Sequence, residues 1–497
     1  MTHEPRKSDR SIVPAKSPNK AQPWAAEATE GRDLAKGNTS QQNAPRTQGR
    51  IRAHSALERV RQAAKKDRNA KFTALFHHIT IDRLREAFMA LRRKAAAGVD
   101  GVTWEQYGVA LEDNLRGLHE RLHRGAYRAK PARRAFIPKA DGRQRPLGIA
   151  SLEDKIVQRA VVEILNAIYE IDFLGFSYGF RPGRHQHHAL DALATAVDRK
   201  RVNWWLDADL RDFFGTLSHD WLVKFVEHRI ADRRIIRLIQ KWLKAGILQD
   251  EVWTECEEGT PQGATASPLL ANLYLHYVFD LWIQQWRNRH ARGAVAVVRF
   301  ADDFVVGFEH RADAMRFWHE LRERLAKFNL ELHPDKTRLV EFGRLPAWRH
   351  RQHGGPAVAT LDFLGFTHIC GRSKNGHFVL KRHTMRKRLR AKLKEVKTEL
   401  FRRRHLPIPD HGRWLASVVR GHCAYYAVPT NSDAIHAFRT QAVRHWRRAL
   451  MRRSQKGFIS WKRMTRLETR WIPPARIQHP LPTARFDVRT QGGSRVR

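Results

Sequence analysis

Three acidic residues occur at the ends of short apolar segments whose composition is typical of β-strands. Residues 204–210 have the pattern of a short buried strand ending near Asp209, and residues 294–308 have the pattern of a hairpin with Asp302 and Asp303 at its tip. An acidic pair at a turn is, on its own, most often a solvated turn. Carboxylates grouped in strand contexts can also hold two Mg²⁺ ions about 3.5–4 Å apart, which activate a 3′-hydroxyl and stabilise a leaving pyrophosphate.

The charge of the chain narrows the class of ligand that such a site would serve. Lys and Arg number 92 against 50 Asp and Glu, which gives a formal net charge of +42 and a sequence pI of about 11.1. A bound polyanion would relieve this self-repulsion, whereas an excess that served solubility alone would mix both signs. We therefore expect a nucleic acid partner.

Cysteine usage and hydropathy predict a soluble protein of a reducing compartment. Cys256, Cys370 and Cys423 form no CxxC pair, so neither a disulfide framework nor a cysteine zinc site is expected. No apolar run reaches the ~18 residues of a membrane-spanning helix, and the N-terminus lacks the apolar part of a signal peptide. The predicted location is the cytoplasm, with no membrane partner.

The composition divides the chain into four predicted parts. Residues 1–70 form a basic, disordered leader, because they are rich in polar residues and lack apolar periodicity. Residues 71–372 contain the acidic strands and a long buried helix behind the capping residue Ser151. Residues 373–475 combine helical spacing of leucines with a dense Lys and Arg face, and residues 476–497 are an irregular tail.

The segments around the acids resemble those of a known enzyme family. Residues 300–303 (FADD) resemble the xADD box of reverse transcriptases, and residues 209–214 (DLRDFF) resemble the first catalytic box of the same enzymes. The remaining blocks of the group II intron reverse transcriptase/maturase family are matched by residues 137–148 (IPKADGRQRPLG), 178–183 (YGFRPG), 259–269 (GTPQGATASPL), 330–337 (LELHPDKT) and 363–366 (FLGF). The resemblance covers roughly residues 90–474.

The resemblance implies a metal site. Asp209 and Asp302 would bridge two Mg²⁺ ions, Asp303 would be a third acid nearby, and the backbone carbonyl of Leu210 would be a further ligand. The reaction implied is RNA-templated DNA synthesis from dNTPs and a primer.

The resemblance also implies a nucleotide site. Lys139 and Arg145 would offset the charge of the incoming triphosphate, as cationic donors can. Phe214 would pack under the sugar and disfavour a 2′-hydroxyl, and Gln262 would contact the nucleotide. Without the resemblance, each Lys or Arg would be read as a solvated surface charge.

The basic C-terminal module resembles the maturase (X) domain, the helical thumb that holds intron RNA. The likeness is carried by residues 420–426 (RGHCAYY). Candidate RNA-binding residues are Arg386, Lys387, Arg390, Lys394, Arg420, Tyr425 and Tyr426. Trp446, Trp461 and Trp471 either stack on unpaired bases or belong to the core, and the second reading is the commoner one for large aromatic residues.

The sequence departs from the family pattern in three places. Gly215 stands where many relatives have Asp, and residues 264–266 replace a run richer in glycine. Nothing after Pro474 resembles an HNH-type nuclease, so we expect no DNA nicking and a primer from another source, such as a replication fork. The histidine cluster at His185 to His188 is interpreted as polar or RNA-facing rather than as a zinc site.

We therefore predict an α+β right-hand polymerase, with fingers and palm followed by an α-helical thumb/maturase domain. It would bind its host group II intron RNA, assist splicing in a ribonucleoprotein particle, and copy the RNA into DNA at a DNA target during intron mobility. The alternatives are a non-catalytic RNA-binding splicing cofactor, and a reverse transcriptase recruited to phage defence or spacer acquisition.

Overall fold

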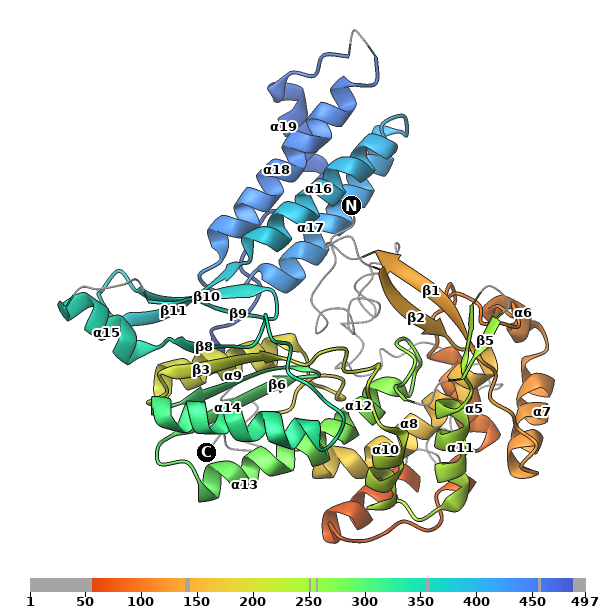
Figure 1. Ribbon diagram of the computed structural model, residues 1–497. Helices are drawn as coiled ribbons and strands as arrows, with labels where there is room; N and C mark the ends of the chain where they lie inside the picture. The colour runs from red at the N-terminus through yellow and green to blue at the C-terminus, as the bar shows by residue number, and fades with distance from the viewer. Residues whose placement is uncertain are drawn as a thin grey trace.

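The computed structural model describes residues 56–138, 144–249, 252–255, 258–353, 358–454 and 457–485, which form a mixed α+β fold (Figure 1). The helical elements are η2 (Phe76–His78), α5 (Ile81–Met89), α6 (Trp104–Val109), α7 (Leu111–His123), α8 (Leu152–Asp172), α9 (Gln186–Arg199), α10 (His219–Glu227), α11 (Arg233–Leu243), α12 (Ser267–Leu275), η3 (His276–Asp280), α13 (Leu281–Arg289), α14 (Arg311–Ala326), α15 (Arg344–His353), α16 (Arg386–Arg402), α17 (Ile408–Tyr426), α18 (Ser432–Met451) and α19 (Trp461–Trp471). The strands are β1 (Ala132–Pro138), β2 (Gln144–Ile149), β3 (Trp204–Asp209), β4 (Ile247–Gln249), β5 (Val252–Thr254), β6 (Val295–Phe300), β7 (Asp303–Phe308), β8 (Arg338–Glu341), β9 (Leu361–Phe363), β10 (Phe366–Arg372) and β11 (Phe378–Thr384).

A four-stranded antiparallel sheet of order β6-β7-β3-β8, the central sheet, carries the acidic residues. Successive side chains of a strand point to opposite faces, so the apolar residues of this sheet enter two separate cores. Leu206 and Val306 pack into the core that contains α14, whereas Trp205 and Val305 pack into the core that contains α9. Helices therefore cover both faces of the sheet (Figure 1). The end of β3 and the start of β7 lie together at one end of the strands, where side chains can take part in chemistry.

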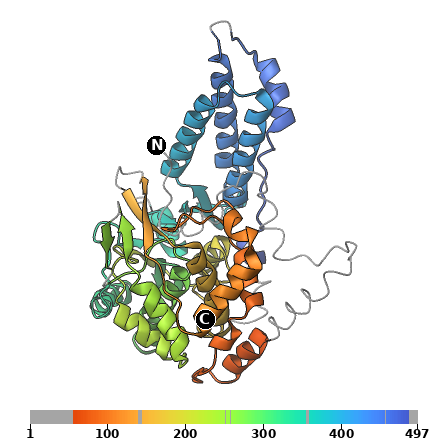
Figure 2. The same ribbon diagram turned by 90° about the vertical axis from the view of Figure 1, so that its right-hand side faces the viewer.

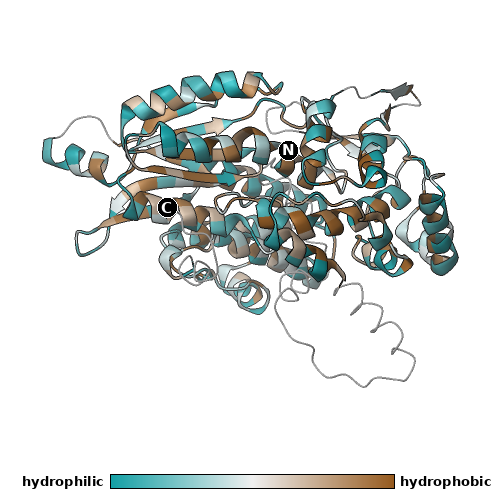
Figure 3. Ribbon diagram, turned by 90° about the horizontal axis from the view of Figure 1, so that it is seen from below, coloured by the Kyte–Doolittle hydropathy of each residue, from teal (hydrophilic) through white to brown (hydrophobic). Residues whose placement is uncertain are grey.

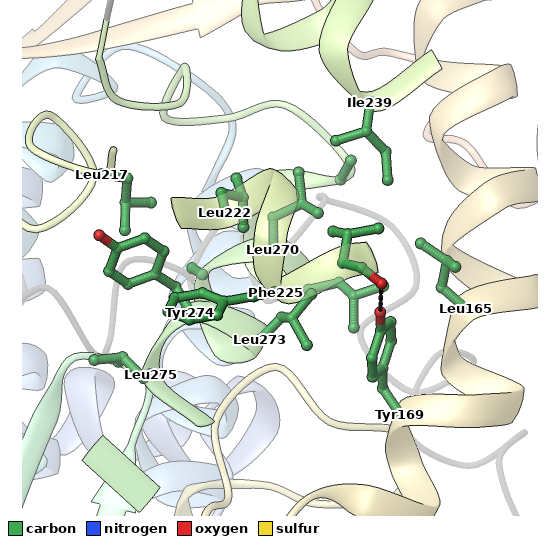
Figure 4. Packing of buried hydrophobic residues seen from close by; sticks show 14 of the residues in the cluster. Leu165, Tyr169, Leu217, Leu222, Phe225, Ile239, Leu270, Leu273, Tyr274 and Leu275 are labelled. Carbon is green, nitrogen blue, oxygen red and sulfur yellow. Dashed lines mark hydrogen bonds between the residues drawn. The ribbon is translucent and has the colours of Figure 1, made fainter. Parts of the chain in front are cut away.

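A second sheet has the order β2-β1-β4-β5 and is called the outer sheet. The larger core is formed by α5, α8, α10 to α14 and one face of the central sheet. Ser151 caps α8, since its hydroxyl accepts a hydrogen bond from the Asp154 amide at 3.3 Å. The buried face of α8 packs against α10, α11 and α12 in this core, and Tyr169 donates a hydrogen bond to the carbonyl of Val226 at 3.2 Å (Figure 4). Helix α8 therefore holds α10, α11 and α12 together in the larger core.

A third, three-stranded sheet of order β11-β10-β9, the junction sheet, connects the central sheet to helices α16 to α19, the helical module. These helices extend away from the central sheet in both views (Figures 1 and 2). Val396, Leu415, Phe438 and Trp446 form part of their own apolar core. The helical module therefore has its own core and is connected to the rest of the molecule through the junction sheet.

Several sequence predictions are confirmed, and others need correction. The strand before Asp209, the hairpin around Asp302 and the helix behind Ser151 are present. Residues 56–66, however, are helical rather than part of a disordered leader, because Val60 and Ala64 share a helical face that is buried in the larger core. Residues 1–55 lie outside the described residues.

The predicted boundary at residue 372 falls between β10 and β11, which pair along their whole length, so the helices begin only at Arg386. The tail is also less irregular than predicted, since residues 482–485 are helical. Seen from below, apolar residues concentrate in the strands and on the inward faces of the helices (Figure 3). In the part of the chain that the structure describes, no helix is long and apolar enough to cross a membrane.

Candidate active site

The three acidic residues meet at one edge of the central sheet. Asp209 ends β3 and lies directly opposite Asp303, the first residue of β7, in the antiparallel register. Asp302 precedes it in the two-residue turn that joins β6 to β7. Asp302 is fully buried, Asp303 is 8% exposed and Asp209 is partly buried. Strand pairing therefore brings together acids that are 93 and 94 positions apart in the sequence.

The turn that carries Asp302 is held by a buried arginine. Arg299 on β6 donates to both carboxylate oxygens of Asp280, at 2.7 and 2.6 Å, and to the carbonyl of Ala301 at 2.9 Å. It also donates to the side chains of Asn272 at 3.0 Å and Ser177 at 2.7 Å. Because these contacts fill the guanidinium, a fully buried cation rigidifies the backbone of the turn.

The turn itself needs an unusual backbone and a close neighbour. Ala301 has φ +56°, in the left-handed region that non-glycine residues rarely adopt. Gly179 approaches so closely that a Cβ at its position would lie 2.2 Å from the Ala301 nitrogen. Gly179 of the YGFRPG segment is therefore required for a structural reason, because any side chain at this position would collide with the turn.

Lys336 is a part of the site to which the sequence analysis assigned no role. Its Nζ lies 2.5 Å from Asp209 Oδ2, while the amide of His333 donates to the Asp209 carbonyl at 2.7 Å. Lys336 lies two residues before β8, and β8 pairs with β3. The sequence around Lys336 does not show this pairing, so the contact with Asp209 could not be predicted from it. Lys336 neutralises part of the acidic charge.

The donor set fits Mg²⁺, which prefers hard oxygen ligands. Asp209 Oδ1 is buried and receives no hydrogen bond from the described residues, so it is available to a cation. Within the described ranges, no group of three His, Cys, Asp or Glu side chains converges closely enough to hold an ion as it stands. The acids thus line a site whose charge is partly compensated by Lys336.

Two of the predicted nucleotide residues, Arg145 and Gln262, contact each other. Arg145 on β2 donates to Gln262 Oε1 at 2.5 Å, and the Gly148 amide donates to the Gln262 carbonyl at 2.8 Å. Burial lowers the pKa of Arg145, while the nearby negative charges of Asp302 and Asp212 act in the opposite direction and raise it. Arg145 and Gln262 therefore form one unit that faces the acids.

The other two nucleotide candidates differ from this pair. Phe214 is buried, its ring meets Phe213 edge to face at 5.3 Å, and its carbonyl accepts a hydrogen bond from Thr260 at 2.8 Å. It follows β3 by five residues, so it belongs to the same strand end as Asp209. Lys139 lies outside the described residues.

The RNA-binding candidates divide into two groups. Arg386, Lys387, Arg390 and Lys394 are exposed on α16, where phosphates can reach them. Tyr425 instead donates to the Leu364 carbonyl at 2.7 Å and stacks on Phe366, and burial raises its pKa well above the ordinary value.

Tyr426 also packs against Phe366. Arg420 is half-buried, and its Nε donates no hydrogen bond to any described residue. The prediction that Tyr425 and Tyr426 contact RNA is not supported, because their rings attach the helical module to the junction sheet.

The histidine cluster needs a similar correction. His187 and His188 are buried rather than RNA-facing, and the His187 ring stacks on His479 of the tail at 3.8 Å. Trp446 is core, and Trp471 packs over Gly412, where a Cβ would lie 2.5 Å from the indole.

The sequence of the chain matches a known protein family and several known proteins. Residues 137–368 match the family described as reverse transcriptase (RNA-dependent DNA polymerase). The chain is 38% identical over 276 residues to Protein YkfC of Escherichia coli, a match covering 49% of this chain and 71% of that protein. It is 34% identical over 238 residues to the Group II intron-encoded protein LtrA of Lactococcus lactis, covering 48% of this chain but only 39% of LtrA. An uncharacterised 91 kDa protein in the cob intron of Schizosaccharomyces pombe is 42% identical over 158 residues, 32% of this chain and 19% of that protein.

Proposed function

Because the chain belongs to the family of group II intron reverse transcriptases and maturases, which are RNA-directed DNA polymerases, we propose that it copies its host intron RNA into DNA and binds that RNA to assist splicing. The central sheet would be the palm, the outer sheet with its helices the fingers, and the helical module the thumb. The observation that carries the proposal is the pairing of Asp209 with Asp303, next to buried Asp302.

The proposed chemistry is nucleotidyl transfer at the acidic edge. Asp209, Asp302 and Asp303, with the Leu210 carbonyl, are the groups that would hold two Mg²⁺ ions. Bound Mg²⁺ supplies a Lewis acid for the primer 3′-hydroxyl and compensates the charge of the leaving pyrophosphate. The rigid turn held by Arg299 keeps the carboxylates in place before substrate arrives, which lowers the cost of reorganisation.

Arg145 and Gln262 would orient the dNTP. A guanidinium donates to phosphate oxygens in a fixed geometry, and the 2.5 Å contact with Gln262 holds it toward the acids. Lys139 would add a second cation, and the Phe214 ring would limit the space under the sugar. The exposed face of α16 would bind phosphates of the intron RNA, and the complex would act in the cytoplasm with a DNA primer and DNA target.

The test is primer extension on an RNA template with dNTPs and Mg²⁺. We expect extension by the parent protein and a loss of at least about 100-fold in the Asp302→Asn/Asp303→Asn variant, since electrostatic stabilisation of this kind contributes factors of that size. Asp113→Asn, which changes an exposed acid in α7, is the matched control and should extend normally. No extension by the parent, together with tight and salt-sensitive intron binding, would replace the polymerase with a non-catalytic splicing cofactor.

A further inference from the structure

Helix α19 begins at the end of the helical module farthest from the central sheet (Figures 1 and 2). Two large aromatic rings, one just before this helix and one at its first residue, are exposed to solvent. Phe458, just before α19, is 72% exposed, and Trp461, its first residue, is 51% exposed. Trp446 in the neighbouring α18 is fully buried. The two rings are three positions apart in the sequence, and exposed apolar side chains that lie together often mark a binding site.

An arginine fixes these rings. The Arg447 guanidinium carbon lies 4.6 Å from the Trp461 ring centroid and 5.9 Å from that of Phe458. Its Nε donates to the carbonyl of Ile459 at 2.9 Å, which holds the guanidinium in position. Cation–π contact covers one part of the indole and limits its motion, so the exposed remainder is preorganised for a flat ligand.

The charge around the rings selects an anionic ligand. Residues 444–470 contain ten lysine and arginine residues against the single acid Glu468. Glu468 is itself paired with Arg439 of α18. Lys462, Arg463 and Arg466 are exposed on the first turns of α19, directly after Trp461. Flat aromatic surfaces among unpaired cations combine base stacking with phosphate binding.

We propose that Phe458, Trp461 and Arg447 form a stacking platform for unpaired bases of RNA, with the α19 cations holding the flanking phosphates. The inference rests on the proposed function in taking RNA as the nucleic acid, and it places a base contact at the far end of the helical module rather than at Tyr425 and Tyr426. Unpaired bases are specified because the faces of duplex bases are already stacked on one another.

The decisive measurement compares single-stranded with duplex RNA. Fluorescence anisotropy would follow binding of a labelled, mixed-sequence single strand of about 16 nucleotides, the upper site size of comparable single-strand binders, and of a duplex of the same composition. For Phe458→Ala/Trp461→Ala we expect single-strand affinity to fall about tenfold or more, because each stacked base contributes on that order. Duplex affinity should change less than about threefold, and the slope of log K against log salt should stay as in the parent, since no phosphate contact is removed.

Three further variants separate stacking from charge and from structure. Trp461→Tyr keeps an aromatic face and should retain most of the single-strand affinity. Lys462→Gln/Arg466→Gln should weaken both RNAs and flatten the salt slope by about 1–2, which the loss of phosphate contacts predicts. Val109→Ala alters an 89% exposed apolar residue of α6 and should change neither affinity.

The proposal is overturned if the double alanine variant binds the single strand as tightly as the parent, or loses single strand and duplex equally. It is also overturned if the variant loses binding to phosphatidylserine vesicles while keeping the single strand, since the rings would then serve a membrane surface. Primer extension on a short, preannealed template is measured in parallel. A parent that fails to extend counts against the polymerase alone, because the single-strand comparison does not depend on catalysis.

Discussion

Lys336 is a counterion within reach of an acidic site, and its side chain is about half exposed. In Lys336→Met the carboxylates lose this neutralising charge, so without divalent ions the unfolding free energy should fall by about 1 kcal/mol or less, as expected for a solvent-screened pair. Added Mg²⁺ should then raise the Tm of the variant more than that of the parent, because it no longer competes with an ammonium for Asp209. Scanning calorimetry with and without Mg²⁺ measures both effects.

Lys336→Arg is the matched control, since it keeps the charge and should keep the parent's response to Mg²⁺. An equal Mg²⁺-dependent rise in Tm for the parent and Lys336→Met would show that the Lys336 ammonium does not compete with divalent ions for Asp209.

Buried histidines make the fold sensitive to mild acid. Burial lowers the pKa of His276 to about 4 and that of His368 to about 3, against 6.5 for an exposed histidine. The unfolded chain therefore binds protons below about pH 6.5 that the folded chain does not, and stability falls as pH drops from there toward the folded pKa values. Each histidine contributes up to about 1.4 kcal/mol per pH unit in that window.

His276→Phe should flatten this dependence, because the ring sits edge to face with Phe173 at 5.4 Å and Phe can keep that contact. Urea unfolding at pH 7.5 and at pH 5 compares the variant with the parent. A variant that loses as much stability as the parent between the two values would show that His276 is not held neutral.

At the scale of elements, the β6–β7 hairpin depends on the Arg299–Asp280 pair, in which both side chains are fully buried. Arg299→Met leaves the Asp280 carboxylate buried without its partner, so we expect a loss of about 3–5 kcal/mol in unfolding free energy. Extension activity should fall even where the protein remains folded, because the turn carrying Asp302 loses the contact to the Ala301 carbonyl. Urea unfolding and primer extension measure the two effects.

Arg316→Met breaks an exposed pair with Glu320 on α14 and serves as the control, with an expected cost below about 1 kcal/mol. Adding Asp280→Asn to Arg299→Met should restore part of the stability, since it removes the unpaired charge. If Arg299→Met cost no more than Arg316→Met, the buried pair would not be what holds the hairpin.

The elements that the sequence predicts correctly are those with strong local patterns. The hairpin follows from two β-rich segments around Asp302, and α8 follows from its four-residue apolar step behind Ser151. Arg299 could not be recognised as buried, because its partners Asp280, Asn272 and Ser177 lie on other elements. The same long-range dependence conceals Lys336 and the structural role of Tyr425.

At the scale of the whole molecule, the helical module is tied to the central body by the end of the described chain. The Gln478 amide donates to the Ala427 carbonyl at 2.9 Å, and His479 stacks on His187 of α9. Sequence composition marks residues 476–485 only as irregular, since nothing local shows that they return to α9. The relative placement of palm and thumb in the proposed polymerase therefore depends on contacts that only the tertiary structure reveals.

Asp191 of α9 is the residue on which this connection converges, because it binds Arg382 of β11 at 2.8 Å and Arg485 of the tail at 3.3 Å. In Asp191→Asn the buried Arg382 keeps its charge without a counterion, so unfolding free energy should fall by about 3 kcal/mol or more. Hydrogen exchange should accelerate most in β11 and residues 476–485, and least in β6 and β7, because the substitution weakens the contact between α9, β11 and the tail rather than the central sheet. Glu395→Gln, which removes a partly exposed pair with Lys392 on α16, should leave this exchange pattern unchanged. Uniform acceleration across the molecule would mean that Asp191 supports the global fold and not the connection between its two bodies.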